Sequence, residues 1–297
     1  MLHLFESHNT FGAMNSGSIR YENLTEEDKK LLCSIHSIDA SGLKDYILKN
    51  PDLWKKDKNM IMQLHHKNLG AAMGFDGKRM FMADQNSDKR GSFFEITKEY
   101  VKAHPNGWTD ISEDLLVVRK ENPGVVIGHP VGDCPVVMMV DRKQGIAIVG
   151  HCSGALIEQK LPTLILETLR SSYKSNPDDV FTYVSACAGD DWTWDKLPKW
   201  VSDANYWLDN RYIVYNKDDG MYHINLRLAI LMQLVKAGIH HKNMMFNMNN
   251  TITDLRYYSN AMGVKHPERD GRHYAGLFYG ENEGNDIILH NGVIKIR

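Results

Sequence analysis

The chain has 297 residues, of which 42% are hydrophobic and 24% are charged, a composition that indicates a globular protein with a packed core. The formal net charge of −2 argues against a dedicated nucleic-acid-binding protein, which would usually be clearly basic. No apolar run approaches the roughly 18 residues of a membrane helix, and the first residues lack the pattern of a signal peptide. The sequence therefore predicts a cytoplasmic protein that has neither nucleic acid nor a membrane as its partner.

The sequence contains no internal repeat and no low-complexity linker, which favours one main domain. We expect residues 59–297 to form this catalytic domain and residues 1–58 to be an N-terminal embellishment. The four cysteines show no CxxC spacing, so we expect them to be reduced thiols. The sequence leaves the oligomeric state open.

Apolar periodicity and turn residues predict the elements of the first 120 residues. Residues 1–22 are expected to be irregular. The predicted elements, in chain order, are a helix that begins at Thr25–Asp28, a short helix that Ser41 caps and that ends before Pro51, a helix over Met60–Met73 closed by Gly74, strands over Met80–Ala83 and Phe93–Ile96, a helical turn over Lys98–Ala103, and a strand over Leu115–Val118.

Strands and helices continue to mix, without strict alternation, over the rest of the chain. The predicted elements are strands over Val125–Ile127, Pro135–Val140 and Ile146–Val149, a helix over Ser153–Tyr173 that Pro162 kinks or begins, a strand over Val180–Ala188, a Trp-rich helix over Trp192–Leu208, a helix over Ile224–Ala237 closed by Gly238, a strand over Met244–Met248, and a hairpin of Asp286–Leu289 and Val293–Ile296 around Asn291-Gly292. This mixture predicts an α/β fold with a mixed β-sheet core flanked by helices.

The strongest chemical signal lies in the three apolar runs between Gly124 and Leu156. The second and third runs flank an Asp–Gly turn, which predicts a hairpin. The outer ends of a hairpin lie side by side, so Cys134, just before one strand, and His151, just after its partner, should be neighbours. An imidazole beside a thiol can take its proton or share a metal with it. Asp133 either orients His151 or fixes the loop. The alternative is a buried cysteine and a structural histidine.

Other candidate site residues follow strand ends or turns. Asp190, in Gly189-Asp190-Asp191, either binds a metal or a ribose hydroxyl, or caps a helix. Arg272, in Gly271-Arg272-His273, either holds an anion or lies in an ordinary turn. The sequence has no Gly-rich phosphate loop, and we expect neither a nicotinamide nor a flavin cofactor. It also has no GxSxG motif.

The order of the elements around Cys134 resembles that of a known family. A buried strand is followed by Asp133-Cys134-Pro135, then by an apolar strand with an Asp turn, and then by a strand that ends in His151. The family is the bacterial laccase-domain family, also called the multicopper polyphenol oxidoreductase or YfiH-like family, which includes purine nucleoside phosphorylases. The resemblance covers about residues 60–280. It extends to Asp114–Val117, to Asn225–Leu234 with Ala237-Gly238-Ile239, to Tyr257-Tyr258-Ser259 and to Gly271-Arg272.

The resemblance implies a site in which one Cys and two His surround a metal, usually zinc, beside a nucleoside pocket. Cys134 and His151 match two of the three ligands. Ser87 stands in the place of the third, so the zinc ligand set is incomplete, and His129 is the candidate replacement. The Trp and Arg of the family's His-Ala-Gly-Trp-Arg-Gly are absent from 151–156. By position, the resemblance implies that Tyr258 and Arg272 contact the substrate. Asp190 is a further candidate for substrate contact, from its place in the Gly189-Asp190-Asp191 loop.

Three hypotheses follow for the function. The first is a laccase-domain enzyme that acts on purine nucleosides, by phosphorolysis, hydrolysis or deamination, through Cys134, His151 and Asp133. The second is a metal-independent Cys–His amidohydrolase or deamidase, since the resemblance implies a fold shared with Cys–His deamidases of the cytotoxic necrotizing factor and chemotaxis types. The third is a non-catalytic relative that binds a nucleotide or a protein. Polyphenol oxidation ranks below these, because the sequence offers too few copper ligands.

Overall fold

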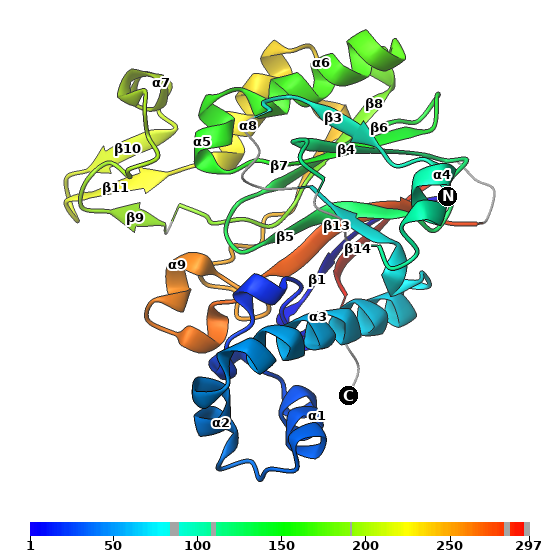
Figure 1. The fold of residues 1–297 in the computed structure, drawn as a ribbon. Coiled ribbons are helices and arrows are strands. Elements are labelled where there is room, and N and C mark those ends of the chain that lie inside the picture. Colours follow the sequence, from blue (N-terminus) through cyan, green and yellow to red (C-terminus); the bar gives the residue numbers. More distant parts are fainter. Residues whose placement is uncertain (84–88, 108–110, 191, 282–285, 294–297) are drawn as a thin grey trace.

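The computed structural model describes residues 1–83, 89–107, 111–190, 192–281 and 286–293. Its core is two stacked β-sheets with helices on both outer faces (Figure 1), which confirms the predicted mixed α/β class. Within the described residues, no helix is long and apolar enough to cross a membrane.

The larger sheet contains six strands. In spatial order they are β12 (Met244–Phe246), β8 (Val180–Val184), β6 (Val136–Asp141), β7 (Ile146–His151), β4 (Leu115–Arg119) and β3 (Phe93–Glu95). The helices α5 (Gly154–Glu158), α6 (Leu161–Tyr173) and α8 (Leu226–Lys236) lie along its outer face in Figure 1. Alternate β7 residues serve the two faces: Ile148 packs under these helices, and Val149 packs between the sheets.

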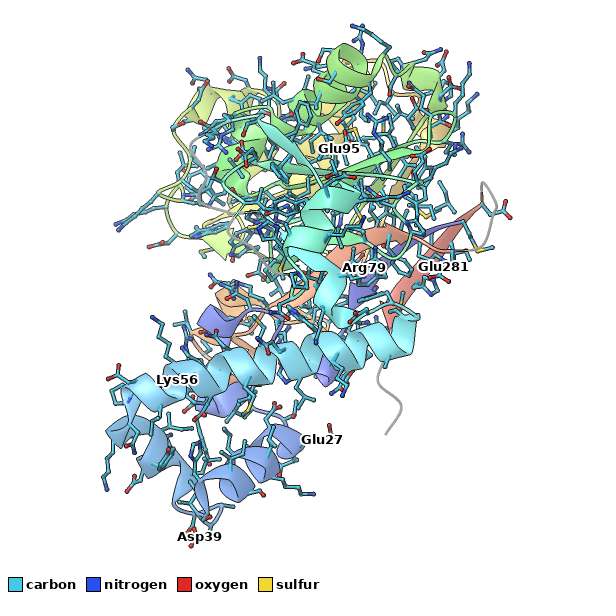
Figure 2. All side chains as sticks on the ribbon, turned by 45° about the vertical axis from the view of Figure 1, so that its right-hand side comes forward. Glu27, Asp39, Lys56, Arg79, Glu95 and Glu281 are labelled. Atoms are coloured by element: carbon cyan, nitrogen blue, oxygen red, sulfur yellow. The ribbon has the colours of Figure 1, made fainter. Side chains whose placement is uncertain are left out.

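The second sheet contains five strands and brings the two ends of the chain together. In spatial order they are β14 (Ile287–Val293), β1 (Leu2–Ser7), β13 (His273–Tyr279), β5 (Val126–Val131) and β2 (Met80–Met82). The long helix α3 (Pro51–Met73) covers its outer face, and α1 (Glu26–His36) and α2 (Leu43–Lys49) lie beyond it. Figure 2 shows this arrangement, with Lys56 on α3 and Glu27 on α1.

The remaining elements are short. They are α4 (Lys98–Ala103), α7 (Ala204–Asp209), α9 (Asn260–Gly263), and a three-stranded sheet in the order β10 (Ile213–Asn216), β11 (Met221–Ile224) and β9 (Thr193–Trp194).

Most predicted helices are confirmed, with different starting residues. The helix at Thr25 begins with a capping box, in which the Thr25 hydroxyl accepts from Asp28 N and the Asp28 carboxylate accepts from Thr25 N. Helix α3 begins at Pro51 rather than Met60, because proline suits a first helical position, where no N–H is needed. Pro162 does begin a helix, separating α6 from α5. Ser41 caps nothing; its hydroxyl donates to Asp39.

The prediction that residues 1–22 are irregular is wrong for β1. Leu2 and Leu4 lie on the same face of β1 and pack between the two sheets. Strands β13 and β14 pair with β1 on its two sides. Polar Glu6 hides this pattern in the sequence. The predicted division at residue 58 falls inside α3, and the separate role of residues 1–58 stays a prediction.

Two other predicted elements are wrong. Residues 192–208 do not form one helix: β9 and α7 lie at their ends, and Pro198 stands between them, where it would break a helix. The C-terminal hairpin is also wrong, because Asn291-Gly292 lie within β14, opposite a bulge in the pairing between Phe5 and Ser7. Residues 294–297 lie outside the described residues.

Candidate functional site

The hairpin of β6 and β7 forms as predicted and sets the position of the two reactive side chains. Its register pairs Val136 with His151. His151 faces the same side of the sheet as Val149, and Cys134 lies in the bend just before β6, at this end of the hairpin. This side is the space between the two sheets, where Val136 and Val149 pack. Among the described contacts, no hydrogen bond joins the Cys134 thiol to the imidazole.

A second imidazole enters the same space from the opposite sheet. Strand β5 carries His129, whose ring centroid lies 5.9 Å from that of His151. His129 is only 1% exposed, and neither of its ring nitrogens has a hydrogen-bond partner among the described residues. The structure thus brings Cys134, His151 and His129 to one end of the inter-sheet core.

Asp133 holds the loop that carries Cys134. One of its carboxylate oxygens accepts from the Thr251 hydroxyl at 2.8 Å, and the other accepts from Ala261 N at 2.7 Å. Its backbone oxygen accepts from Ala188 N at 2.8 Å. Because both carboxylate oxygens are occupied by other loops, Asp133 fixes the loop rather than orienting His151. The second of its two predicted roles is therefore the one that the geometry supports.

Arg272 supplies a positive charge beside the site. Its guanidinium donates to Gly271 O at 2.7 Å and to Asn260 Oδ1 at 3.0 Å. A Cβ atom built on Gly132 would lie 3.6 Å from Arg272 Nη1, so the guanidinium lies over the Cys134 loop. Its charge partly offsets the burial that raises the pKa of Cys134, and it adds to the burial that lowers the pKa of His151. Arg272 Nη1 also lies 3.6 Å from Asp270 Oδ1, and anion binding by Arg272 stays a prediction.

Cys134 and His151 are both neutral near pH 7. Desolvation by burial, with a further contribution from Asp133, raises the pKa of the Cys134 thiol to about 12. Burial, followed by the Arg272 charge, lowers the pKa of His151 to about 4. The thiol therefore carries its proton at rest, and any nucleophilic attack must transfer that proton during the reaction.

Tyr258 and Asp190 do not join this group. Tyr258 is 2% exposed in a hydrophobic cluster with Ile61 of α3, and its ring covers Gly271. That placement favours a structural role, and substrate contact by Tyr258 stays a prediction. Asp190 lines a separate pocket with Arg227, described below.

Comparison with models of known protein families shows the family of the chain. A family model described as multi-copper polyphenol oxidoreductase laccase matches residues 43–278. The chain belongs to this family. The match confirms the resemblance drawn from Asp133-Cys134-Pro135 and His151. None of the curated proteins matches the chain.

Three solved structures share the fold of this laccase-family chain. YfiH, a hypothetical protein of Bacillus licheniformis, is 14% identical, with a TM-score of 0.59 over 74% of this chain and 81% of that one. YlmD from Geobacillus stearothermophilus is 16% identical, with a TM-score of 0.59 over 75% and 81%. A Neisseria meningitidis protein is 13% identical, with a TM-score of 0.53 over 74% and 82%. Likeness at these identities establishes the fold and not the activity.

The site does not provide a metal-binding set among the described residues. Copper is named in the family's description, and zinc is implied by the resemblance. No group of three or more His, Cys, Asp or Glu side chains in the described ranges can hold a metal ion, so Cys134, His151 and His129 do not form the predicted zinc ligand set. Ser87, in the place of the family's third ligand, lies outside the described residues. The described donors therefore fit neither metal.

Sequence reasoning missed Glu6, which supports the site from β1. Its Oε1 accepts from the Tyr183 hydroxyl at 2.6 Å and from Asn247 Nδ2 at 2.9 Å, and its Oε2 accepts from Ala186 N at 3.0 Å. Burial raises the pKa of this carboxyl. Glu6 thereby ties β1 to the end of β8. The available signal was an acidic residue in step with the buried Leu2 and Leu4.

Because several histidines are buried, we expect the free energy of unfolding to decrease as the pH falls. Burial lowers the pKa of both His129 and His273 to about 3, whereas an unfolded histidine titrates near 6.5. Below about pH 6.5 the unfolded chain binds more protons, so the free energy of unfolding falls by up to about 1.4 kcal/mol per pH unit for each group. Urea unfolding at about pH 7, 6 and 5 measures this slope. His273→Leu should reduce it by about 1 kcal/mol per pH unit; an unchanged slope contradicts the assignment.

Proposed function

We propose that this chain is a laccase-domain enzyme that acts on purine nucleosides, by phosphorolysis, hydrolysis or deamination, at the site of Cys134 and His151. The observation that supports the proposal is the register of β6 and β7, in which His151 pairs with Val136 and the bend that carries Cys134 lies at the same end of the hairpin. Arg272 lies beside them and can bind an anionic group such as phosphate.

The neutral state of His151 suits it to accept a proton. A neutral imidazole can take the proton of an attacking water, phosphate or thiol, and can return it to a leaving base or amine. Asp133 keeps the Cys134 loop in place through Thr251 and Ala261 while the reaction proceeds. All four cysteines are free thiols, and a reactive Cys134 must stay reduced, so we expect the enzyme to act in the cytoplasm.

The proposal is tested by incubating the purified chain with inosine and with adenosine, each with and without phosphate. We expect release of free base or of ammonia from at least one of them. Release that needs phosphate identifies phosphorolysis, and release without it identifies hydrolysis or deamination. If neither nucleoside is converted under either condition, the proposed substrate class is wrong.

A second candidate is a metal-independent Cys–His amidohydrolase, which the described donor set favours because it fits no metal. The Cys134 sulfur would attack a carboxamide carbon as His151 takes the thiol proton, and that proton would leave with ammonia as the C–N bond breaks. A water molecule would then hydrolyse the thioester, which releases the carboxylic acid and restores the thiol. Ammonia release from a glutamine-containing peptide in the presence of a chelator is the result that this candidate requires. Loss of all activity on adding the chelator would contradict it.

A further inference from the structure

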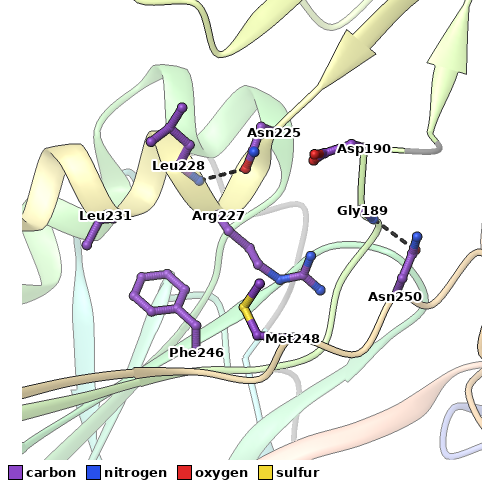
Figure 3. A pocket seen from close by; sticks show the side chains of 9 residues that line it. All are labelled: Gly189, Asp190, Asn225, Arg227, Leu228, Leu231, Phe246, Met248 and Asn250. Atoms are coloured by element: carbon purple, nitrogen blue, oxygen red, sulfur yellow. Dashed lines mark hydrogen bonds between the residues drawn. The ribbon is translucent and has the colours of Figure 1, made fainter.

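A pocket of about 520 Å³ opens beside the first turn of α8 (Figure 3). It lies between α8, the end of β12 and the loop that follows β8. Its lining includes Arg227, Asp190 and a group of apolar side chains, and none of Cys134, His151 or Arg272 takes part. The pocket therefore borders the Cys134 loop without including these three side chains, because Gly189 and Asn250 adjoin Ala188 and Thr251, which both donate to Asp133.

The guanidinium of Arg227 is fixed by the backbone. Its Nε donates to Asn247 O at 3.1 Å, and its Nη2 donates to Cys187 O at 3.1 Å and to Asn249 O at 2.5 Å. Nη1 has no partner among the described residues, and no described carboxylate forms an ion pair with Arg227. Figure 3 shows the guanidinium pointing toward Gly189 and Asn250, within the pocket. Three backbone carbonyl oxygens thus hold the Arg227 guanidinium in place and leave its Nη1 available to a ligand.

An opposite charge borders the same pocket. The Asp190 side chain is exposed, and its carboxylate accepts no hydrogen bond from the described residues. Its backbone oxygen lies 3.0 Å from Nδ1 of His223, a contact that fixes the loop. The carboxylate does not reach Arg227, so the two charges face one cavity without neutralising each other. Two unpaired and opposite charges complement a ligand that carries both signs.

The wall opposite these charges is apolar. It is formed by Leu228, Leu231, Phe246 and Met248. Met248 is 73% exposed, so an unbranched and adaptable side chain stands at the rim, able to close over a ligand of variable shape. An apolar surface with a few placed polar groups is the usual composition of a small-molecule site.

We propose that this pocket binds a zwitterionic α-amino acid with an apolar side chain. Arg227 Nη1 binds its carboxylate, Asp190 binds its ammonium group, and Leu231, Phe246 and Met248 enclose the side chain. The single available nitrogen of Arg227 suits one carboxylate oxygen better than a phosphate, which normally needs several donors. This binding does not depend on the proposed nucleoside chemistry.

Calorimetric titration of the full chain tests the proposal with L-leucine, L-methionine and L-phenylalanine. Comparison ligands are 4-methylpentanoate, which has only the carboxylate, 3-methylbutylamine, which has only the amine, and adenosine monophosphate. We expect at least one amino acid to bind at least about tenfold more tightly than either single-charge analogue. No binding of any of the three, equal binding of an analogue, or tighter binding of the nucleotide would overturn the proposal.

The charge on Asp190 provides the matched variant. Asp190 is exposed, so Asp190→Asn should fold normally, and it should weaken amino-acid binding about tenfold or more without weakening 4-methylpentanoate binding. Asp195→Asn removes an exposed carboxylate that does not line the pocket and should change neither affinity. Wild-type affinity in the Asp190→Asn variant would place the ligand elsewhere and overturn the assignment.

Discussion

Replacing Cys134 with alanine is expected to lower kcat/KM for the converted nucleoside by about 10³-fold or more, while the protein remains folded. Cys134 is the partly exposed thiol at the His151 end of the described hairpin, whereas Cys152 at that end is buried in the core under α5 and α6. Loss of a group of this kind typically removes several kcal/mol of transition-state stabilisation. The measurement is steady-state release of base or ammonia, with circular dichroism to confirm the fold.

Cys33 provides the matched control for this variant. It is also a partly buried free thiol, but it lies in α1, on the far side of the five-stranded sheet from Cys134. Cys33→Ala should leave kcat/KM within about twofold of the wild-type value, within the usual effect of a distant substitution. Equal losses in the two variants, or undiminished turnover in Cys134→Ala, would remove Cys134 from the chemistry.

Asp133→Ala is expected to reduce the free energy of unfolding by about 3 kcal/mol or more. The buried carboxylate receives a hydroxyl and a backbone N–H from two distant loops, and hydrogen bonds to a charged group contribute about 1.5–3 kcal/mol each. Asp133→Asn should reduce the free energy of unfolding much less. Its amide oxygen can still accept from Ala261 N, and its amide nitrogen can donate to the Thr251 hydroxyl.

Urea unfolding of the two variants beside the wild type measures this difference. Asp195→Ala, at an exposed carboxylate, should stay within about 0.5 kcal/mol of the wild type. Asp133→Asn should also raise the alkylation rate of Cys134 at a given pH, because the Asp133 charge raises the pKa of that thiol. An Asp133→Ala protein as stable as the wild type would show that the loop is held by other contacts.

Sequence patterns correctly predicted the strands and turns that depend on neighbouring residues in the chain. The runs that became β5, β6 and β7 are apolar on both faces because both faces are covered, and the Asp–Gly turn set the hairpin register. That register puts the bend that carries Cys134 at the same end of the hairpin as His151. The same reasoning could not foresee that His129 approaches from the second sheet, since β5 and β7 belong to different sheets.

The strands that the sequence did not predict are stabilised by pairing with strands that are distant in the sequence. Strand β13 was not predicted, because His273 and Gly276 interrupt its apolar run. The paired glycines Gly128 and Gly276 are required there, since a Cβ on either would lie within about 2.7 Å of the Tyr274 ring and of the facing backbone. Neither β1 nor β14 forms a local hairpin; each is stabilised by strands from the other end of the chain.

A double-mutant cycle tests most directly whether the hairpin's thiol and imidazole act as one unit. The measured quantity is kcat/KM for Cys134→Ala, His151→Ala and the double variant. If the two groups act in the same step, the double variant should be no slower than the slower single variant, as in other catalytic groups that work together. Losses that multiply would show that the groups act independently and would contradict the shared site.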